Sequence, residues 1–292
     1  ADAPPARPAP AAPSEPSAKA SRWEPGLFMT QAVANVLKNA LEIGQGTTWG
    51  FDEDISILGA YVKPGASVSF DRVLKAGERY AFIGGGDGDA TDVDLVVAER
   101  GGKEVARDRD DDATPATSFA PAKTATYTIT LTLEAARRAS FCALILMRKG
   151  GYDVPVDNLK DALVKAILLG ARANDQMGGA KFHEEPNQWS LFGTILAPAT
   201  AITLNRLRLE PGQHVVVAAA DDSAKDVDLV LTDKAGRVIA KDDDDDATPV
   251  VGAATDGQPY NLQIKNHPAR APALVIATVL DVPPEEDAAT EK

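Results

Sequence analysis

The chain has 292 residues, of which 44% are hydrophobic and 25% are charged, values typical of a folded globular protein. Acidic residues outnumber basic ones, 43 to 30, and the net charge of −13 argues against nucleic acid as a partner, because affinity for phosphates depends on cationic side chains. No run of residues is long and apolar enough for a transmembrane segment. One cysteine excludes an internal disulfide, and with three histidines it leaves little material for a zinc site or a His-based triad.

Residues 1–25 form a Pro/Ala-rich tail whose composition predicts disorder. The chain starts with Ala rather than Met, and we interpret the tail as a linker behind a cleaved signal peptide. This interpretation predicts export to the periplasm or the outside of a bacterial cell. A Pro-rich segment can also be the ligand of a groove-type binding module. Residues 284–292 form a second, acidic tail.

The two halves of the chain repeat one pattern. The sequence Asp-Val-Asp-Leu-Val at residues 92–96 recurs at 226–230, and Asp-Asp-Asp-Ala-Thr-Pro at 110–115 recurs at 244–249, so both pairs share a spacing of 134 residues. One register kept over many positions predicts two copies of one structural unit. We place these units at residues 26–150 and 151–283.

Each unit is predicted to begin with a helix. In the first, apolar residues recur at helical spacing over residues 29–43 and Gly44 ends the helix. In the second, Asp157 is the expected N-cap and Gly170 the expected end. The predicted apolar faces consist of Val33, Val36, Leu37, Ala40 and Leu41 in the first helix, and of Leu159, Leu163, Ile167 and Leu168 in the second. Because lone helices of this length are marginal in water, we expect both to pack on the strands that follow.

The rest of each unit is predicted to form short strands, because segments rich in β-branched and aromatic residues alternate with Gly-containing turns. The predicted strands are 56–62, 67–74, 79–83, 92–98, 103–107, 124–133 and 141–147 in the first unit, and 189–196, 201–209, 214–219, 227–232, 238–241, 260–265 and 273–280 in the second. About eight strands with short turns indicate a jelly-roll β-sandwich. The predicted fold class is therefore mainly β, with two tandem jelly-roll-like units, each preceded by one α-helix.

Residues 92–129 carry a recognisable order of features. An Asp-x-Asp-Leu strand is followed by a Gly-Gly turn, a strand that runs into an acidic loop, a segment with Pro121, and a Thr-Tyr-Thr-Ile strand around Tyr127. This order resembles the bacterial pre-peptidase C-terminal domain and is similar to the collagen-binding domains of secreted collagenases. The usual Gly two residues before the Tyr is Ala125 here, and the helices lie outside that family's core. The resemblance implies a secreted accessory β-sandwich that in some members binds calcium and is usually attached to an enzyme.

The acidic runs are the candidate metal sites, since crowded carboxylates repel one another and calcium prefers six to eight oxygen ligands. The alternating acids at 108–112 and 242–246 do not continue into an EF-hand, because Ala113 and Ala247 stand where its Gly would be. A solvated acidic loop is the alternative to a calcium site. The candidate ligands are Asp92, Asp94, Asp108, Asp110 and Asp112, with Asp226, Asp228, Asp242, Asp244 and Asp246 in the second unit.

Other motifs receive structural interpretations. The run Gly-Gly-Gly-Asp-Gly at 84–88 lacks the Lys-Ser/Thr and the helix of a phosphate loop, so a flexible rim loop is expected. We expect His183 at the surface and Cys142 buried in an apolar strand. The aromatic residues near the start of each unit either fasten a loop to the sandwich or form a ligand platform; they are Trp49, Phe51, Phe182 and Trp189.

These features predict an exported, non-enzymatic binding or scaffold protein of the cell envelope, with calcium as its candidate ion and a protein or extracellular polymer as its partner. One alternative is a subunit of a larger envelope assembly held by the Pro-rich tail. Another is an enzyme with an unrecognised acidic site. Catalytic groups present in only one unit would favour the enzyme, whereas acidic runs in both units favour a structural or metal role.

Overall fold

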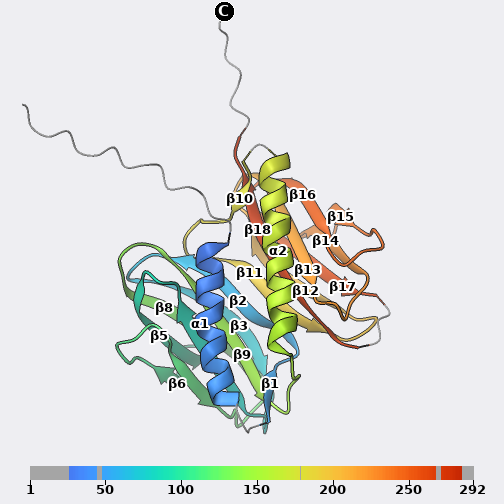
Figure 1. Cartoon of the computed structure of the whole chain (residues 1–292). Coiled ribbons are helices and arrows are strands. Elements are labelled where there is room, and N and C mark those ends of the chain that lie inside the picture. The colour runs from blue at the N-terminus through green and yellow to red at the C-terminus, as the bar shows by residue number, and fades with distance from the viewer. Residues whose placement is uncertain (1–25, 45–47, 178, 268–270, 285–292) are drawn as a thin grey trace, which may run out of the picture.

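The computed structural model describes residues 26–44, 48–177, 179–267 and 271–284. The predictions for residues 1–25 and for 285–292 lie outside these residues. The described chain forms three layers: helices α1 (Leu27–Gly44) and α2 (Val156–Gln176), a ten-stranded sheet, and two four-stranded sheets on the far side of it. Both helices lie across the same face of the large sheet (Figure 1). Neither described helix has a stretch of sufficient length and hydropathy to span a bilayer.

The strands follow the same order in both units. The first unit contains β1 (Trp49–Phe51), β2 (Asp54–Val62), β3 (Ala66–Leu74), β4 (Tyr80–Gly86), β5 (Ala90–Glu99), β6 (Glu104–Asp108), β7 (Ala116–Phe119), β8 (Ala125–Ala136) and β9 (Ser140–Lys149). The second contains β10 (Lys181–Phe182), β11 (Gln188–Leu196), β12 (Ala201–Arg208), β13 (Gly212–Ala220), β14 (Val227–Asp233), β15 (Val238–Asp242), β16 (Val250–Thr255), β17 (Pro259–Asn266) and β18 (Ala273–Val282).

The order of strands within the sheets is that of a jelly roll. In the first unit the order β2-β9-β4-β7 faces the order β3-β8-β5-β6, and in the second β11-β18-β13-β16 faces β12-β17-β14-β15. Each unit is thus an eight-stranded double sheet of two Greek keys, with a short additional strand at the rim. The predicted fold class, two jelly-roll sandwiches each preceded by a helix, is confirmed.

The two units are joined through the edges of their larger sheets and are not separate along the chain. Strand β2 pairs antiparallel with β11, its own equivalent in the second unit, and this pair makes one continuous sheet of the two larger halves. In this pair Leu58 lies opposite Phe192. Phe192 is the residue that matches Leu58 in the second unit, at the repeat spacing of 134 residues. An approximate two-fold axis therefore passes close to this residue pair, as it does in a symmetric dimer.

Two apolar layers hold the three structural layers together. Alternate residues of the large sheet pack on the helices, and those between them pack on the small sheets. This alternation follows from the two-residue period of a strand, which sends successive side chains to opposite faces. Helix α1 inserts Val33 and Val36, and helix α2 inserts Leu159 and Leu163, all of them buried.

The helix predictions need three corrections. Leu41 and Leu168 were expected on the buried faces but lie on the solvent side, 46% and 53% exposed, because the sheet covers only a narrow stripe of each helix. Helix α2 also continues past Gly170 to Gln176, and Gly170 is a site of close packing, where a Cβ atom would lie 2.4 Å from the ring of Phe182. Pro155 is the N-cap, and Asp157 lies in the first turn, where its charge favours the helix dipole.

The expected flexible loop at residues 84–88 is wrong in its first half. Gly84, Gly85 and Gly86 are buried in strand β4. A Cβ atom on Gly85 would lie 2.6 Å from the side chain of Val36, so the close approach of helix α1 requires glycine there. Four strands also lie outside the predicted segments, namely β1, β7, β10 and β16. They are two to six residues long and depend on a partner strand rather than on their own pattern.

Candidate functional site

The two acidic loops share one conformation, and the first and last carboxylates of each loop bind the loop's own backbone. Asp108 accepts hydrogen bonds from two amides of its loop at 3.1 and 2.8 Å, and Asp112 accepts one from the amide of Thr114 at 2.7 Å. In the second unit Asp242 and Asp246 make the equivalent contacts. Four of the ten candidate metal ligands therefore stabilise turns, a common use of Asp side chains.

The middle residues of the loops, Asp110 and Asp244, are exposed, and their carboxylates make no hydrogen bond with any described residue. Each loop nevertheless lies against the Asp-x-Asp strand of its unit. The amide of Val93 donates to the carbonyl of Asp112 at 2.8 Å, and a bond of the same length holds the second loop to strand β14. Carboxylates from two separate segments thus gather at one rim of each sandwich.

The first rim concentrates negative charge that Arg109 compensates only in part. Asp92 and Asp94 on β5 lie opposite the part of β8 that carries Glu134, and Asp92 Oδ1 is buried with no hydrogen-bond partner among the described residues. Burial, together with the charges of Asp111 and Glu134, raises the pKa of Asp92. Burial and Glu134 also raise the pKa of Asp94, although Arg109 lies 3.6 Å away and opposes the shift. The rim therefore favours the arrival of a proton or a cation.

The second rim supplies its own cations. Lys265 Nζ lies 3.2 Å from Asp228 Oδ2, and His267 Nε2 lies 2.7 Å from the same oxygen. The other nitrogen of His267 lies 3.5 Å from Asp226. Burial by itself raises the pKa of Asp228, but hydrogen bonds from His267 and Lys265 outweigh it, and the pKa is lowered. The rim is thus an internal ion-pair cluster.

The contrast between the rims comes from two positions on equivalent strands. Lys265 on strand β17 and His267 directly after it stand where strand β8 carries Thr132 and Glu134. Both units keep the Asp-x-Asp strand and the acidic loop. The segment paired with that strand carries a hydroxyl and a carboxylate side chain in the first unit and two basic side chains in the second. The first rim therefore offers only oxygen ligands, whereas Asp226, Asp228 and His267 of the second rim are the rim residues that bring three ligand atoms within 4.8 Å of one another in the described part of the chain.

A groove runs between the two small sheets above the line where the units meet; we call it the junction groove. It consists of two adjoining hollows of about 530 and 410 Å³ that share Phe70, Asp71, Leu204 and Asn205. Strand β3 of the first unit and strand β12 of the second form its walls. Trp189 also lines it and bridges the units, because its indole N–H donates to the carbonyl of Ser69 at 2.9 Å.

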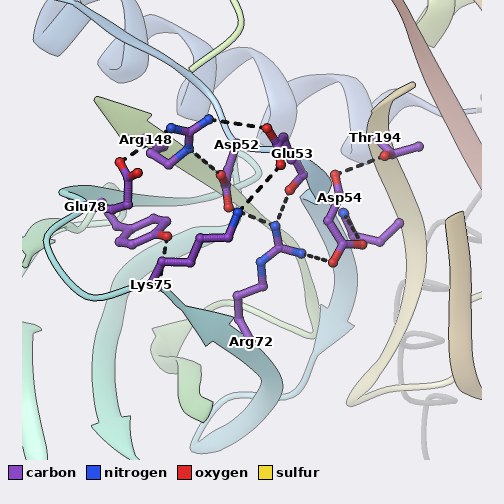
Figure 2. A network of polar contacts seen from close by, with 10 residues as sticks. Asp52, Glu53, Asp54, Arg72, Lys75, Glu78, Arg148 and Thr194 are labelled. Atoms are coloured by element: carbon purple, nitrogen blue, oxygen red, sulfur yellow. Dashed lines mark hydrogen bonds and ion pairs between the residues drawn. The ribbon is translucent and has the colours of Figure 1, made fainter. Parts of the chain in front are cut away.

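One end of the junction groove is closed by a buried ion-pair network (Figure 2). The side chain of Arg72 is only 8% exposed and lies between the carboxylates of Asp52, at 2.8 Å, and Asp54. Asp52 is held from its other side by Arg148 at 2.9 Å. Thr194 of strand β11 donates to the carbonyl of Asp54 at 3.0 Å and ties the network to the second unit.

The second unit has no arginine at the position of Arg72. Strand pairing places Arg72 opposite Tyr127 and Leu207 opposite the matched Tyr260, so the buried Leu207 takes the place of Arg72. Arg206, 134 residues after Arg72, is the extra residue of a bulge in strand β12; it is exposed and has φ of 61°. Neither Arg206 nor Arg208 has an ion-pair partner among the described residues, and both line the junction groove.

Three single-residue predictions have different outcomes. His183 was expected at the surface but is 3% exposed, because Asp281 draws it beneath strand β18. Cys142 is buried as expected, and burial raises the pKa of its thiol. Phe51 and Phe182 are buried and fasten the short strands to the helix layer.

The arginines of the junction groove and the basic residues of the second rim are not among the predicted sites. A signal for them exists in the sequence, namely positions at which the two copies differ in charge. Asp52 corresponds to His183, and Glu134 corresponds to His267. These residues are not 134 positions apart, because the loops of the two units differ in length, so the correspondence becomes visible only from the strand pairing.

No model of a known protein family matches the chain, and no curated protein matches it. Solved structures with distant similarity include a lectin of Pleurotus ostreatus, 10% identical over 80% of this chain and 81% of that one, with a TM-score of 0.22. The major capsid protein P2 of bacteriophage PM2 is 13% identical over 80% of this chain and 99% of that one, with a TM-score of 0.21. The tandem CBM22 domains of Paenibacillus barcinonensis Xyn10C are 8% identical over 80% of this chain and 99% of that one, with a TM-score of 0.20. Likeness of this size does not indicate a function.

Proposed function

We propose that the chain is an exported, non-enzymatic binding protein of the cell envelope, and that its junction groove binds an extended anionic polymer. The observation that carries this proposal is the state of Arg206. Arg206, the extra residue of the β12 bulge, and its neighbour Arg208 line the groove without ion-pair partners among the described residues. In a chain with a net charge of −13, two uncompensated guanidinium groups in one groove favour a negatively charged ligand.

Around the two arginines, Trp189 and Gln188 suit a sugar polymer that carries carboxylates. A guanidinium binds a carboxylate through two parallel hydrogen bonds, which fixes orientation as well as charge. Trp189 provides an apolar ring, and the carbonyl oxygen of the Gln188 side chain is a buried acceptor with no partner among the described residues. A hydroxyl donor of a ligand would satisfy that oxygen. Both walls belong to rigid strands, which positions these groups before the ligand arrives.

The proposal predicts measurable binding of polygalacturonate, an acidic polysaccharide, and none of dextran, a neutral one. The titration is followed by calorimetry in EDTA, so that calcium cannot link the polymer to the acidic rim. We expect Arg206→Gln to weaken binding about tenfold or more, because a hydrogen bond to a charged group contributes about 1.5–3 kcal/mol. The matched control is Arg237→Gln, since Arg237 is 78% exposed and lies on the β14–β15 turn away from the groove.

Equal binding by wild type and Arg206→Gln, or equal binding of both polysaccharides, would contradict the proposed ligand. Retention of an envelope protein by the wild-type chain in an envelope extract, with loss in Arg206→Gln, would instead place a protein in the groove. Presence of the chain in the cytosol rather than in the envelope fraction would contradict the export part of the proposal independently of the ligand.

We also propose that calcium stabilises the fold through the first rim. The support is the unpartnered Oδ1 of Asp92 and the raised pKa values of Asp92 and Asp94, which burial and the neighbouring carboxylates cause. Asp92, Asp94 and Glu134 would provide carboxylate oxygens, and the exposed Asp110 and Asp111 lie on the adjoining loop. In the second rim Lys265 and His267 already contact Asp228, so that carboxylate has basic partners within the chain.

Calcium at a hundredfold excess over its Kd is expected to add about 2.7 kcal/mol to the free energy of unfolding, which a thermal melt of metal-stripped protein detects. Asp92→Asn should abolish the increase, and Asp226→Asn, the same change at the matched position, should leave it intact. Magnesium should act more weakly because it demands octahedral geometry. An unchanged melt in millimolar calcium would show that the rims are solvated acidic loops, and equal loss in both variants would contradict the assignment to the first rim.

A further inference from the structure

The second unit contains a cluster of two histidines and one carboxylate on three adjacent segments. His183 directly follows strand β10, His214 lies on β13, and Asp281 lies on β18, the strand between them. Strand pairing places His214 directly opposite Asp281, and Lys181, two residues before His183, opposite Asp281 on the other side. The Nδ1 atoms of His183 and His214 lie 2.8 and 2.9 Å from the same oxygen, Asp281 Oδ1.

The orientation of His214 is the one that a metal-binding histidine adopts. Its Nε2 lies 2.8 Å from the backbone carbonyl of Glu210, and because a carbonyl only accepts, Nε2 carries a proton. Nδ1 therefore faces the Asp281 carboxylate either with a second proton or with a lone pair directed at a shared cation. Metal-bound histidines are usually fixed in this way, with the distal N–H held by a carbonyl or a carboxylate.

Burial and access also fit a bound ion. His183 and His214 are 3% and 6% exposed, while the Asp281 side chain is 41% exposed, so one side of the cluster faces solvent. His214 also lines an open hollow of about 1070 Å³ together with Gln213 and Val282. An ion can therefore enter, and water can complete its coordination. The three ligand atoms lie within 4.8 Å of one another, close enough to contact one ion after small shifts.

The first unit shows what replaces an ion at this place. The residues matched to His183, His214 and Asp281 by strand pairing are Asp52, Tyr80 and Arg148. There the Asp52 and Arg148 side chains form a permanent ion pair at 2.9 Å. The second unit reverses the positions of acid and base and uses imidazoles, which can offer lone pairs as a guanidinium cannot.

We infer that His183, His214 and Asp281 form a binding site for one divalent transition-metal ion of the zinc class, present only in the second unit. Two imidazole nitrogens and one carboxylate oxygen are a ligand set that zinc accepts, with a fourth position left for water. The metal would hold β10 and β13 to β18, as the Asp52–Arg148 ion pair holds the matched segments of the first unit. This site is separate from the junction groove and from both acidic rims.

The test uses the full chain, stripped of metal and then saturated with calcium so that the acidic rim is filled. We expect Zn²⁺ to bind with a stoichiometry of one by calorimetry, and Co²⁺ to give the intense visible absorption of a four-coordinate site. His214→Tyr introduces the residue of the matched position, and we expect it to weaken Zn²⁺ binding by more than the roughly hundredfold loss caused by removing an outer partner. His183→Gln should have a similar effect, and both variants should lose the rise in melting temperature that Zn²⁺ gives the wild type.

His267→Gln is the matched control, because His267 is a histidine of the same unit that lies at the acidic rim instead. It should bind Zn²⁺ as the wild type does. Absence of Zn²⁺ and Co²⁺ binding in the wild type would overturn the inference, and this result does not depend on whether any variant folds. Loss of binding in His267→Gln with retention in folded His214→Tyr would also overturn it, since the ion would then belong to the rim.

Discussion

Replacing Arg72 by Met is expected to lower the free energy of unfolding by about 3 kcal/mol, near the lower end for a broken buried ion pair. Arg72 and Asp52 are both less than one tenth exposed, so removal of the guanidinium leaves a buried carboxylate with one partner fewer (Figure 2). Arg148 still compensates part of this charge, which keeps the loss from reaching the upper end. Urea unfolding followed by circular dichroism measures the effect.

Arg206→Met is the matched control for this substitution. It removes the same side chain from the corresponding strand of the second unit, but Arg206 is an exposed bulge residue with no ion-pair partner among the described residues. Its effect on unfolding should stay within about 0.5 kcal/mol, as for other surface substitutions. Equal losses for Arg72→Met and Arg206→Met would show that the buried network does not stabilise the junction.

Replacing Leu163 by Ala is expected to lower the free energy of unfolding by about 2–5 kcal/mol, the usual range for a buried Leu. Leu163 is 6% exposed and lies in the apolar layer between helix α2 and the large sheet. The truncation would leave a cavity that a helix fixed on a sheet cannot close by collapse. The midpoint of urea unfolding should decrease with little change in the slope.

The neighbouring residue provides the control for the helix. Val164 is 52% exposed, so Val164→Ala removes two methyl groups that contact water rather than the sheet, and it should change stability by less than about 0.5 kcal/mol. An unchanged midpoint for Leu163→Ala would mean that helix α2 contributes little to the second sandwich. That result would contradict the helix as an integral layer of the unit.

The features that depend on local patterns can be predicted from the sequence. The repeat at 134 residues, the helices at the start of each unit, most strands and the burial of Cys142 follow from periodicity and turn residues. Side-chain direction alternates every two residues in a strand and recurs every 3.6 in a helix, so these patterns show in a single segment. They were sufficient for the jelly-roll fold class.

How the two units meet, and which residues face one another there, depends on contacts between distant segments. The pairing of β2 with β11 depends on which sheet edges remain free after each roll closes, and no local pattern records that. The same holds for His183, which a loop-like sequence placed at the surface and which Asp281, nearly one hundred residues away, draws into the interior. Arg72 and Arg206 are 134 residues apart, as the repeat spacing predicts, yet Arg72 is buried against Asp52 while Arg206 is an exposed bulge residue and Leu207 takes the buried position. Strand pairing decides which residue of a strand faces inward, and a shift of one residue reverses it.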